Sequence, residues 1–394
     1  MTVAKKMSLF AEQSSWIRKM FEEGAKMKAK YGAENVFDFS LGNPDVPPPP
    51  KFTEVLQDLA NNDKPGVHAY MPNGGYPYVR ETLAHRLSEE QGVHVDQGDV
   101  LMTCGAAGAL NVMLKSVLDP GDEVIILSPF FVEYKFYVDN NGGVSKVVPT
   151  DEEFNLDLGA IKKALNEKTK VIIINSPNNP TGQIYTSDSL KKLGKLLDSY
   201  EDKCYRSIYL VSDEPYRKIV FDGHEVPSIM KATVNSIVIS SYSKDLSLPG
   251  ERIGYLAVHP QIKDKKALLN AMTLANRILG FVNAPALMQR IVEQLQEVTV
   301  DTSIYARRRE IFCKILDDAG YEYVKPKGAF YLFPKSPIED DVEFCALLQQ
   351  EKILAVPGRG FGAPGYFRLA FCVDDAVIER SADAFRKVMQ KARG

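Results

Sequence analysis

The segment from Ser240 to Gly254, SSYSKDLSLPGERIG, is the most informative stretch of this chain for its fold and its chemistry. It directly follows the apolar run Ile237–Ile239, so a buried strand is expected to lead into a polar turn. The turn carries Lys244 and, eight residues later, Arg252. Desolvation and a nearby guanidinium both favour the neutral form of a lysine, which makes its amine available as nucleophile and base.

The hydroxyl groups of this turn, that of Ser241 among them, and the guanidinium of Arg252 suit a phosphate dianion, because charge-assisted hydrogen bonds to phosphate favour arginine. An amine nucleophile beside a phosphate seat predicts pyridoxal phosphate held by Lys244 as a Schiff base. On this stretch alone, the alternative is a surface loop with an ordinary solvated lysine.

Composition sets the broad class. A chain of 394 residues predicts about two domains, and 45% hydrophobic with 25% charged residues is typical of a soluble globular protein. A net charge of −3 without basic runs argues against nucleic acid as a partner. The five cysteines are odd in number and never spaced CxxC, which indicates reduced thiols in a cytoplasmic protein without a zinc site. No apolar stretch reaches the ~18 residues of a membrane span.

A pattern of apolar strand, polar turn and helix repeats through the middle of the chain. The apolar runs are residues 100–103, 123–127, 171–174, 208–211 and 237–239. Continuous apolar runs predict strands buried on both faces, as in a mainly parallel α/β sheet flanked by helices. Ligands gather at the carboxyl ends of such strands, so the turns that follow are expected to face one site. Helical patterning from residue 261 and short strands near 328–334 and 366–371 predict a smaller α+β domain.

Two of these turns carry polar residues that suit a pyridine ring. Asp213 ends a predicted strand, where ionisation is costly unless the carboxylate faces a cation such as a protonated pyridine nitrogen. The alternative for Asp213 is a helix N-cap or a turn residue. Asn179 and Tyr216 could donate hydrogen bonds to a phenolate oxygen on the ring, although asparagine before proline is also a common turn residue.

Two further signals are less specific. Gly105, Ala106 and Ala107 begin a predicted helix with small side chains, which leaves backbone N–H groups accessible to an anion. Small residues at a helix start can equally reflect close packing. Phe131 could stack on an aromatic ring, although a phenylalanine is by default a core residue.

Taken together, the motifs resemble those of the class I/II aminotransferases of aspartate-aminotransferase type, which have fold type I. The resemblance is carried by SPNNPTG at residues 176–182, SDEPY at 212–216, and SYSK at 241–244 with RIG at 252–254. It extends from SLGNPD at residues 40–45 to FRL at 367–369. Order, spacing and strand-end position all agree.

The resemblance implies a role for each matching residue. Lys244 would form the Schiff base and act as acid and base, Asp213 would pair with the pyridine nitrogen, and Asn179 with Tyr216 would hold the ring oxygen. Phe131 would stack on the ring. The phosphate would be held by Gly105, Ala106, Ala107, Ser241, Arg252 and, from the other protomer of a homodimer, Tyr70. The substrate would be bound by Gly42, Asn179 and Arg368, the last through its α-carboxylate.

The activity expected from this resemblance is transfer of an amino group from an α-amino acid to a 2-oxo acid by a ping-pong mechanism. One alternative is a carbon–sulfur lyase that uses the same cofactor and fold; another is a regulatory protein built on that fold. The expected domains are residues 1–50 (an arm and part of the small domain), 51–282 (the cofactor-binding domain) and 283–394 (the small domain).

The resemblance leaves the substrate open. Some aspartate-using relatives carry a lysine where this chain has Ala107, which puts aspartate in doubt. Arg277 is a candidate replacement cation, and the alternative is a solvated arginine on a helix face.

Overall fold

The computed structural model describes residues 2–13, 16–204 and 206–393, and the contacts within it divide the chain into two compact units. The large unit comprises Val46–Thr302 and Lys327–Ala329. The small unit comprises Met1–Asp45, Ser303–Pro326 and Phe330–Gly394, so it draws on both ends of the chain, as predicted.

The limits of these units differ from the predicted domain boundaries, which lie after residues 50 and 282. Residues 283–302 group with the large unit. The reason is helix α10 (Ala286–Glu293), which buries Met288 and Ile291 in the core of that unit.

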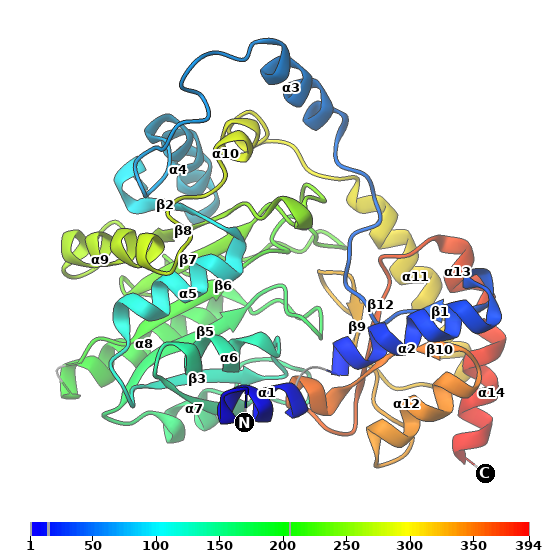
Figure 1. The fold of residues 1–394 in the computed structure, drawn as a ribbon. Helices are drawn as coiled ribbons and strands as arrows, with labels where there is room; N and C mark the ends of the chain where they lie inside the picture. The colour runs from blue at the N-terminus through cyan, green and yellow to red at the C-terminus, as the bar shows by residue number, and fades with distance from the viewer. Residues whose placement is uncertain (1, 14–15, 205, 394) are drawn as a thin grey trace. The chain divides into compact units, whose positions relative to one another are not determined.

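The large unit is built around a sheet of seven described strands in the order β2-β8-β7-β6-β5-β3-β4 (Figure 1). The bounds are β2 Val100–Thr103, β3 Glu123–Ser128, β4 Val144–Pro149, β5 Thr169–Asn175, β6 Tyr209–Asp213, β7 Ser236–Ser241 and β8 Gly254–Val258. Among these strands, only β8 runs in the opposite direction, and it pairs antiparallel with both of its neighbours, β2 and β7. The predicted mainly parallel sheet is confirmed, and each of the five apolar runs forms a strand.

The sequence analysis does not predict β4 or β8. β4 is an edge strand whose residues are mostly exposed or half-buried, so it lacks the continuous apolar run of the inner strands. β8 starts two residues after Arg252 and is fully buried between β2 and β7. Only β4 lacks a local signal: residues 255–258 of β8 form an apolar run of the kind that predicts a buried strand, and the sequence analysis missed it.

Both faces of this sheet are covered by helices, which is why its inner strands are apolar throughout. Along β5, Ile172 and Ile174 pack into one core cluster and Val171 and Ile173 into the other. Helices α4, α8 and α10 contribute to the first cluster, and α5, α6 and α9 to the second. The helices of the large unit are α3 Pro50–Asn61, α4 Pro77–Gln91, α5 Gly105–Val117, α6 Glu133–Asn140, α7 Leu158–Ala164, α8 Ser187–Cys204, α9 Lys265–Ile278 and α10, with 3₁₀ turns at Gln97–Asp99 and Pro249–Glu251.

The small unit combines helices with short strands. β1 (Phe37–Asp38) runs parallel to β10 (Ile353–Leu354), and β12 (Phe367–Ala370) lies antiparallel between β11 (Val356–Pro357) and β9 (Tyr331–Leu332). Its helices are α1 Lys5–Gln13, α2 Trp16–Tyr31, α11 Thr302–Ala319, α12 Asp341–Gln350, α13 Asp375–Arg380 and α14 Ala382–Arg393, with 3₁₀ turns at Ala33–Asn35 and Gly358–Phe361. No described helix is both long and apolar enough to cross a bilayer.

Candidate active site

Strands β5, β6 and β7 are parallel neighbours, and each leads into one of the motifs found in the sequence. Asn175, at the end of β5, pairs with Asp213 at the end of β6. The side-chain Nδ2 of Asn175 also donates a hydrogen bond to the backbone oxygen of Asp213 at 2.8 Å. The segments that carry Asn179, Tyr216 and Lys244 therefore begin side by side at one edge of the sheet.

Asp213 is buried, with only 5% of the residue exposed. Its Oδ2 accepts a hydrogen bond from the hydroxyl of Tyr134 at 2.6 Å, whereas its Oδ1 is buried without a hydrogen-bond partner among the described residues. Burial raises the pKa of Asp213 to about 7, opposed by the hydrogen bond from Tyr134 and reinforced by the negative charge of Glu214. A buried carboxylate oxygen without a partner fits a cationic donor.

Tyr134, at the start of α6, is a site residue that the sequence analysis missed. It is buried, and its burial and the neighbouring Asp213 hold the pKa of its hydroxyl well above the ordinary value, so that it remains a donor. The ring of Phe131 lies edge-on to that of Tyr134, with centroids 5.6 Å apart. Phe131 thus lies beside Tyr134, the hydrogen-bond partner of Asp213. Nothing in the sequence distinguishes Tyr134 from an ordinary core tyrosine.

Lys244 lies in the turn after β7, and its Nζ is 5.9 Å from the centroid of the Tyr216 ring. Tyr216 and Asn179 are both buried. The backbone N–H of Asn179 donates to Oδ1 of Asn175 at 2.7 Å, which fixes the turn after β5 to the end of its own strand. The predicted amine and phenol thus lie close together on turns that follow adjacent strands.

The start of α5 meets Arg252 across β8. Gly105 has φ +72°, and a Cβ there would lie 2.8 Å from the Nη2 of Arg252. Gly254 pairs with both Thr103 of β2 and Ser241 of β7, and a Cβ on it would lie 2.7 Å from the backbone of Gly105. Glycine at these two positions therefore allows the helix N-terminus, the guanidinium and Ser241 to converge.

A second cluster of predicted residues lies within the small unit. Arg368 on β12 is only 2% exposed, and its Nη2 donates to the backbone oxygen of Ser40 at 2.6 Å. Its Cζ lies 4.7 Å from the ring centroid of Tyr331 and 4.9 Å from that of Phe361. A Cβ at Gly42 would clash with the Tyr331 hydroxyl, so the absence of a side chain there is required by packing. The segment of Gly42 thus lies next to the guanidinium.

The family model for aminotransferase class I and II matches residues 34–385. The chain belongs to this family. The predicted fold class, the use of pyridoxal phosphate and aminotransferase activity are thereby confirmed, and the lyase alternative is not favoured. The polar residues described above at the ends of β5, β6 and β7 are in keeping with membership of this family.

Relatives of this aminotransferase cover nearly its whole length. A probable aspartate aminotransferase of Methanocaldococcus jannaschii is 32% identical over 366 residues, 90% of this chain and 93% of the relative. The aspartate aminotransferase of Geobacillus stearothermophilus is 31% identical over 387 residues, 94% of each chain. A crystal structure of an amino transferase from Eubacterium rectale matches with a TM-score of 0.97 and 39% identity over 100% of both chains. The Thermus thermophilus aspartate aminotransferase with maleate matches at 0.85 and 27% identity, over 95% of this chain and 97% of that one.

The residues present in this aminotransferase fit its cofactor. The unpartnered Oδ1 of Asp213 offers an acceptor for a protonated ring nitrogen, and Lys244 offers an amine near the same strand ends. The N-terminus of α5, which includes Ala106 and Ala107, and the guanidinium of Arg252 offer donors for a phosphate.

Two other predicted residues of this aminotransferase lie on the surface of the large unit. Tyr70 is 90% exposed. Arg277 lies in the last turn of α9 with an exposed side chain. Neither position assigns a role by itself.

Proposed function

We propose that this aminotransferase moves the amino group of an α-amino acid to a 2-oxo acid, with Lys244, Asp213 and Tyr216 as its catalytic residues. The observation that carries the assignment is the buried Oδ1 of Asp213, which has no hydrogen-bond partner among the described residues. An ionised carboxylate in this position needs a cationic partner, and a protonated pyridine nitrogen is one.

Pyridoxal phosphate supplies an electron sink that stabilises negative charge at the Cα atom of the amino acid. In this proposal, Nζ of Lys244 would hold the cofactor in the resting enzyme and would serve as the base for the proton on that Cα atom. Asp213 would hold the ring nitrogen in its protonated form, and Asn179 with Tyr216 would donate hydrogen bonds to the ring oxygen. Phe131 would stack on the ring. The closeness of Lys244 to Tyr216, 5.9 Å from Nζ to ring centroid, supports these joint roles.

The phosphate is proposed to bind at the N-terminus of α5, where Gly105, Ala106 and Ala107 present backbone N–H groups, together with the Ser241 hydroxyl and Arg252. Support comes from the 2.8 Å approach of the Arg252 guanidinium to the Cβ position of Gly105, which an alanine would obstruct. A helix N-terminus and a guanidinium are complementary to a dianion.

The substrate carboxylate is proposed to bind Arg368, with the backbone of Gly42 and the side chain of Asn179 as further contacts. Arg368 is buried, and guanidinium groups bind carboxylates in bidentate geometry. The two aromatic rings against its Cζ restrict its orientation, which favours one direction of approach for the carboxylate.

We also infer a cytoplasmic homodimer in which Tyr70 of the partner subunit reaches the phosphate. A tyrosine that is 90% exposed on its own chain has a hydroxyl available to another. Cys104, Cys313, Cys345 and Cys372 form no disulfide among the described residues, in keeping with a reducing compartment.

Borohydride reduction of the enzyme with its cofactor, followed by peptide mapping, tests the proposal. The label is expected on Lys244, and Lys244→Ala is expected to bind the cofactor noncovalently without turnover. A label on any other lysine would overturn the assignment.

A screen of amino acids for conversion of the bound cofactor to its amine form defines the substrate. Several relatives are named for aspartate, so dicarboxylic amino acids come first in that screen. Parallel measurements on Arg277→Leu decide between its two interpretations: a loss confined to dicarboxylic substrates indicates binding, and no loss indicates a solvated arginine.

A further inference from the structure

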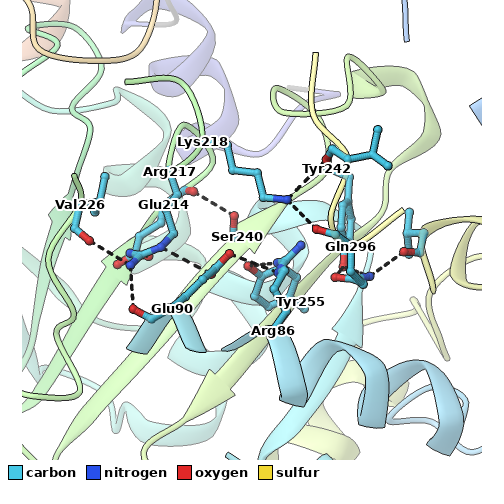
Figure 2. Close-up of polar contacts among 12 residues, drawn as sticks. Arg86, Glu90, Glu214, Arg217, Lys218, Val226, Ser240, Tyr242, Tyr255 and Gln296 are labelled. Carbon is cyan, nitrogen blue, oxygen red and sulfur yellow. Dashed lines mark hydrogen bonds and ion pairs between the residues drawn. The ribbon is translucent and has the colours of Figure 1, made fainter. Parts of the chain in front are cut away.

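A group of buried and half-buried charged side chains lies at the end of β6, next in sequence to the aspartate of the site. Glu214 directly follows the last residue of β6, and its side chain pairs with Arg217, whereas that of Asp213 accepts a hydrogen bond from a tyrosine of α6. Glu214 is 1% exposed and contacts Arg217, which reaches Glu90 of α4, which in turn contacts Arg86 (Figure 2). We call these four residues the charge network.

Arg217 is the centre of this network. Its Nη1 donates to Oε2 of Glu214 at 2.7 Å, and its Nε lies 3.5 Å from Oε2 of Glu90. Its Nη2 donates to the backbone oxygens of Glu90 at 3.1 Å and Val226 at 2.9 Å. One guanidinium thus joins the segment after β6, the end of α4 and the loop at residue 226.

The network contains two cations and two carboxylates, so its formal charges sum to zero. Arg86 completes it with Nε 3.3 Å from Oε1 of Glu90, and its Nη2 donates to the Tyr255 hydroxyl at 2.7 Å. Without Arg217, the buried Glu214 and the half-buried Glu90 would be two carboxylates with one remaining cation, Arg86. Breaking a buried ion pair by removing one partner is far more disruptive than removing both.

The backbone of Glu214 is hydrogen-bonded to β7, the strand that precedes the turn with Lys244. Its N–H donates to the oxygen of Ile239 at 2.8 Å, and its oxygen accepts a hydrogen bond from the Ser240 hydroxyl at 2.9 Å. Ser240 directly precedes Ser241 of the proposed phosphate seat. The peptide after Asp213 is therefore held both to β7 and, through the Glu214 side chain, to α4.

We propose that Arg217 is a positioning residue for the cofactor: by neutralising and anchoring Glu214, it holds the carboxylate of Asp213 in the orientation and charge state that bind the ring nitrogen. The proposal rests on the role of Asp213 proposed above. It assigns Arg217 no contact with cofactor or substrate.

The charges around Asp213 are consistent with this role. Tyr134 and Tyr137 of α6 face the carboxylate as neutral phenols, and Glu214, next in the chain, is a negative neighbour whose charge raises the pKa of Asp213. Burial raises the pKa of Glu214 as well, and Arg217 opposes that rise. Arg217 thus acts on Asp213 only through Glu214.

A double-mutant cycle on cofactor binding tests the proposal. The dissociation constant of pyridoxal phosphate is measured by absorbance titration of the apoenzyme for wild type, Arg217→Met, Asp213→Asn and the double variant. Arg217→Met is expected to weaken binding by about tenfold in the Asp213 background, within the range of coupling inside one ion-pair network. In the Asp213→Asn background, the same substitution is expected to change binding by less than about twofold.

Further variants separate positioning from general destabilisation. Arg217→Lys should recover part of the affinity, and adding Glu214→Gln to Arg217→Met should recover more, because both charges of the pair are then removed. If Arg217→Met does not fold, Glu214→Gln takes its place in the cycle, since it keeps the shape of the side chain. Lys192→Met, which breaks an exposed ion pair with Asp188 on α8, is the matched control and should leave affinity unchanged.

The outcomes are distinct. Equal losses in the two Asp213 backgrounds would show that Arg217 is merely structural and would overturn the inference. If Asp213→Asn alone leaves the dissociation constant unchanged, the proposed role of Asp213 fails first. A loss on Asp213→Asn together with no loss on Arg217→Met would overturn the inference while leaving the proposed function intact.

Discussion

Asp213→Asn should stabilise the apoenzyme at alkaline pH although it weakens cofactor binding. In the apoenzyme, burial raises the pKa of Asp213 from 3.8 to about 7. The folded state therefore binds more protons than the unfolded state between these two values, and the stability contributed by this group falls as pH rises across that window. Asparagine carries no charge, and its side-chain oxygen can still accept the Tyr134 hydrogen bond, so the variant should lack that fall.

The magnitude follows from the difference between the two pKa values. About three pH units at 1.36 kcal/mol each correspond to about 4 kcal/mol. The free energy of unfolding of Asp213→Asn relative to wild type should thus increase by up to about 4 kcal/mol between pH 4 and pH 8 and stay level above pH 8. With added pyridoxal phosphate, the wild type should become the more stable of the two proteins, because it binds the cofactor more tightly and is therefore stabilised more.

Urea unfolding of the two apoenzymes at a series of pH values measures this difference. Asp188→Asn serves as the control, because Asp188 is an exposed carboxylate on α8 whose loss should alter stability little at any pH. If the wild-type and Asp213→Asn stabilities stay parallel from pH 4 to pH 8, Asp213 is not a destabilising buried carboxylate in the apoenzyme. That result would refute the assignment of a cationic cofactor nitrogen as the partner of Asp213.

Three more predictions address the rest of the site. Tyr134→Phe should raise the pKa of Asp213 further, because the hydrogen bond that stabilises the carboxylate is lost. Titration of the apoenzyme with cofactor should then show weaker binding near pH 6.5 and nearly unchanged binding at pH 8.5. Equal losses of affinity at the two pH values would contradict this. Arg368→Leu should lower kcat/KM for every amino acid alike, because the transition state loses about 2–4 kcal/mol of binding free energy. With the decarboxylated amine as substrate, the variant and the wild type should not differ. Tyr70→Phe should weaken cofactor binding, and mixing its protomers with those of Lys244→Ala should restore activity. No restoration on mixing would place Tyr70 outside the partner's site.

Most of the strand framework and the main chemical groups can be predicted from the sequence. Continuous apolar runs predict strands buried on both faces, and parallel strands present their carboxyl ends at one edge. Lys244 and Asp213 each follow or end such a run, so their convergence could be predicted from strand position alone. The arginine and small residues near the helix start likewise pointed to a phosphate.

Tertiary structure alone decided which side chains pair. The 2.6 Å contact between Tyr134 and Asp213 joins residues 79 positions apart, and no local pattern marks either as the partner of the other. The approach of Gly105 to Arg252 depends on the antiparallel pairing of β8 between β2 and β7, and an apolar run alone does not say which strands it will pair with. The ion pair between the buried Glu214 and the half-buried Arg217 is likewise not predicted from the sequence. Hydrophobic periodicity records only which side of an element is covered, whereas hydrogen bonds and ion pairs depend on which distant element covers it.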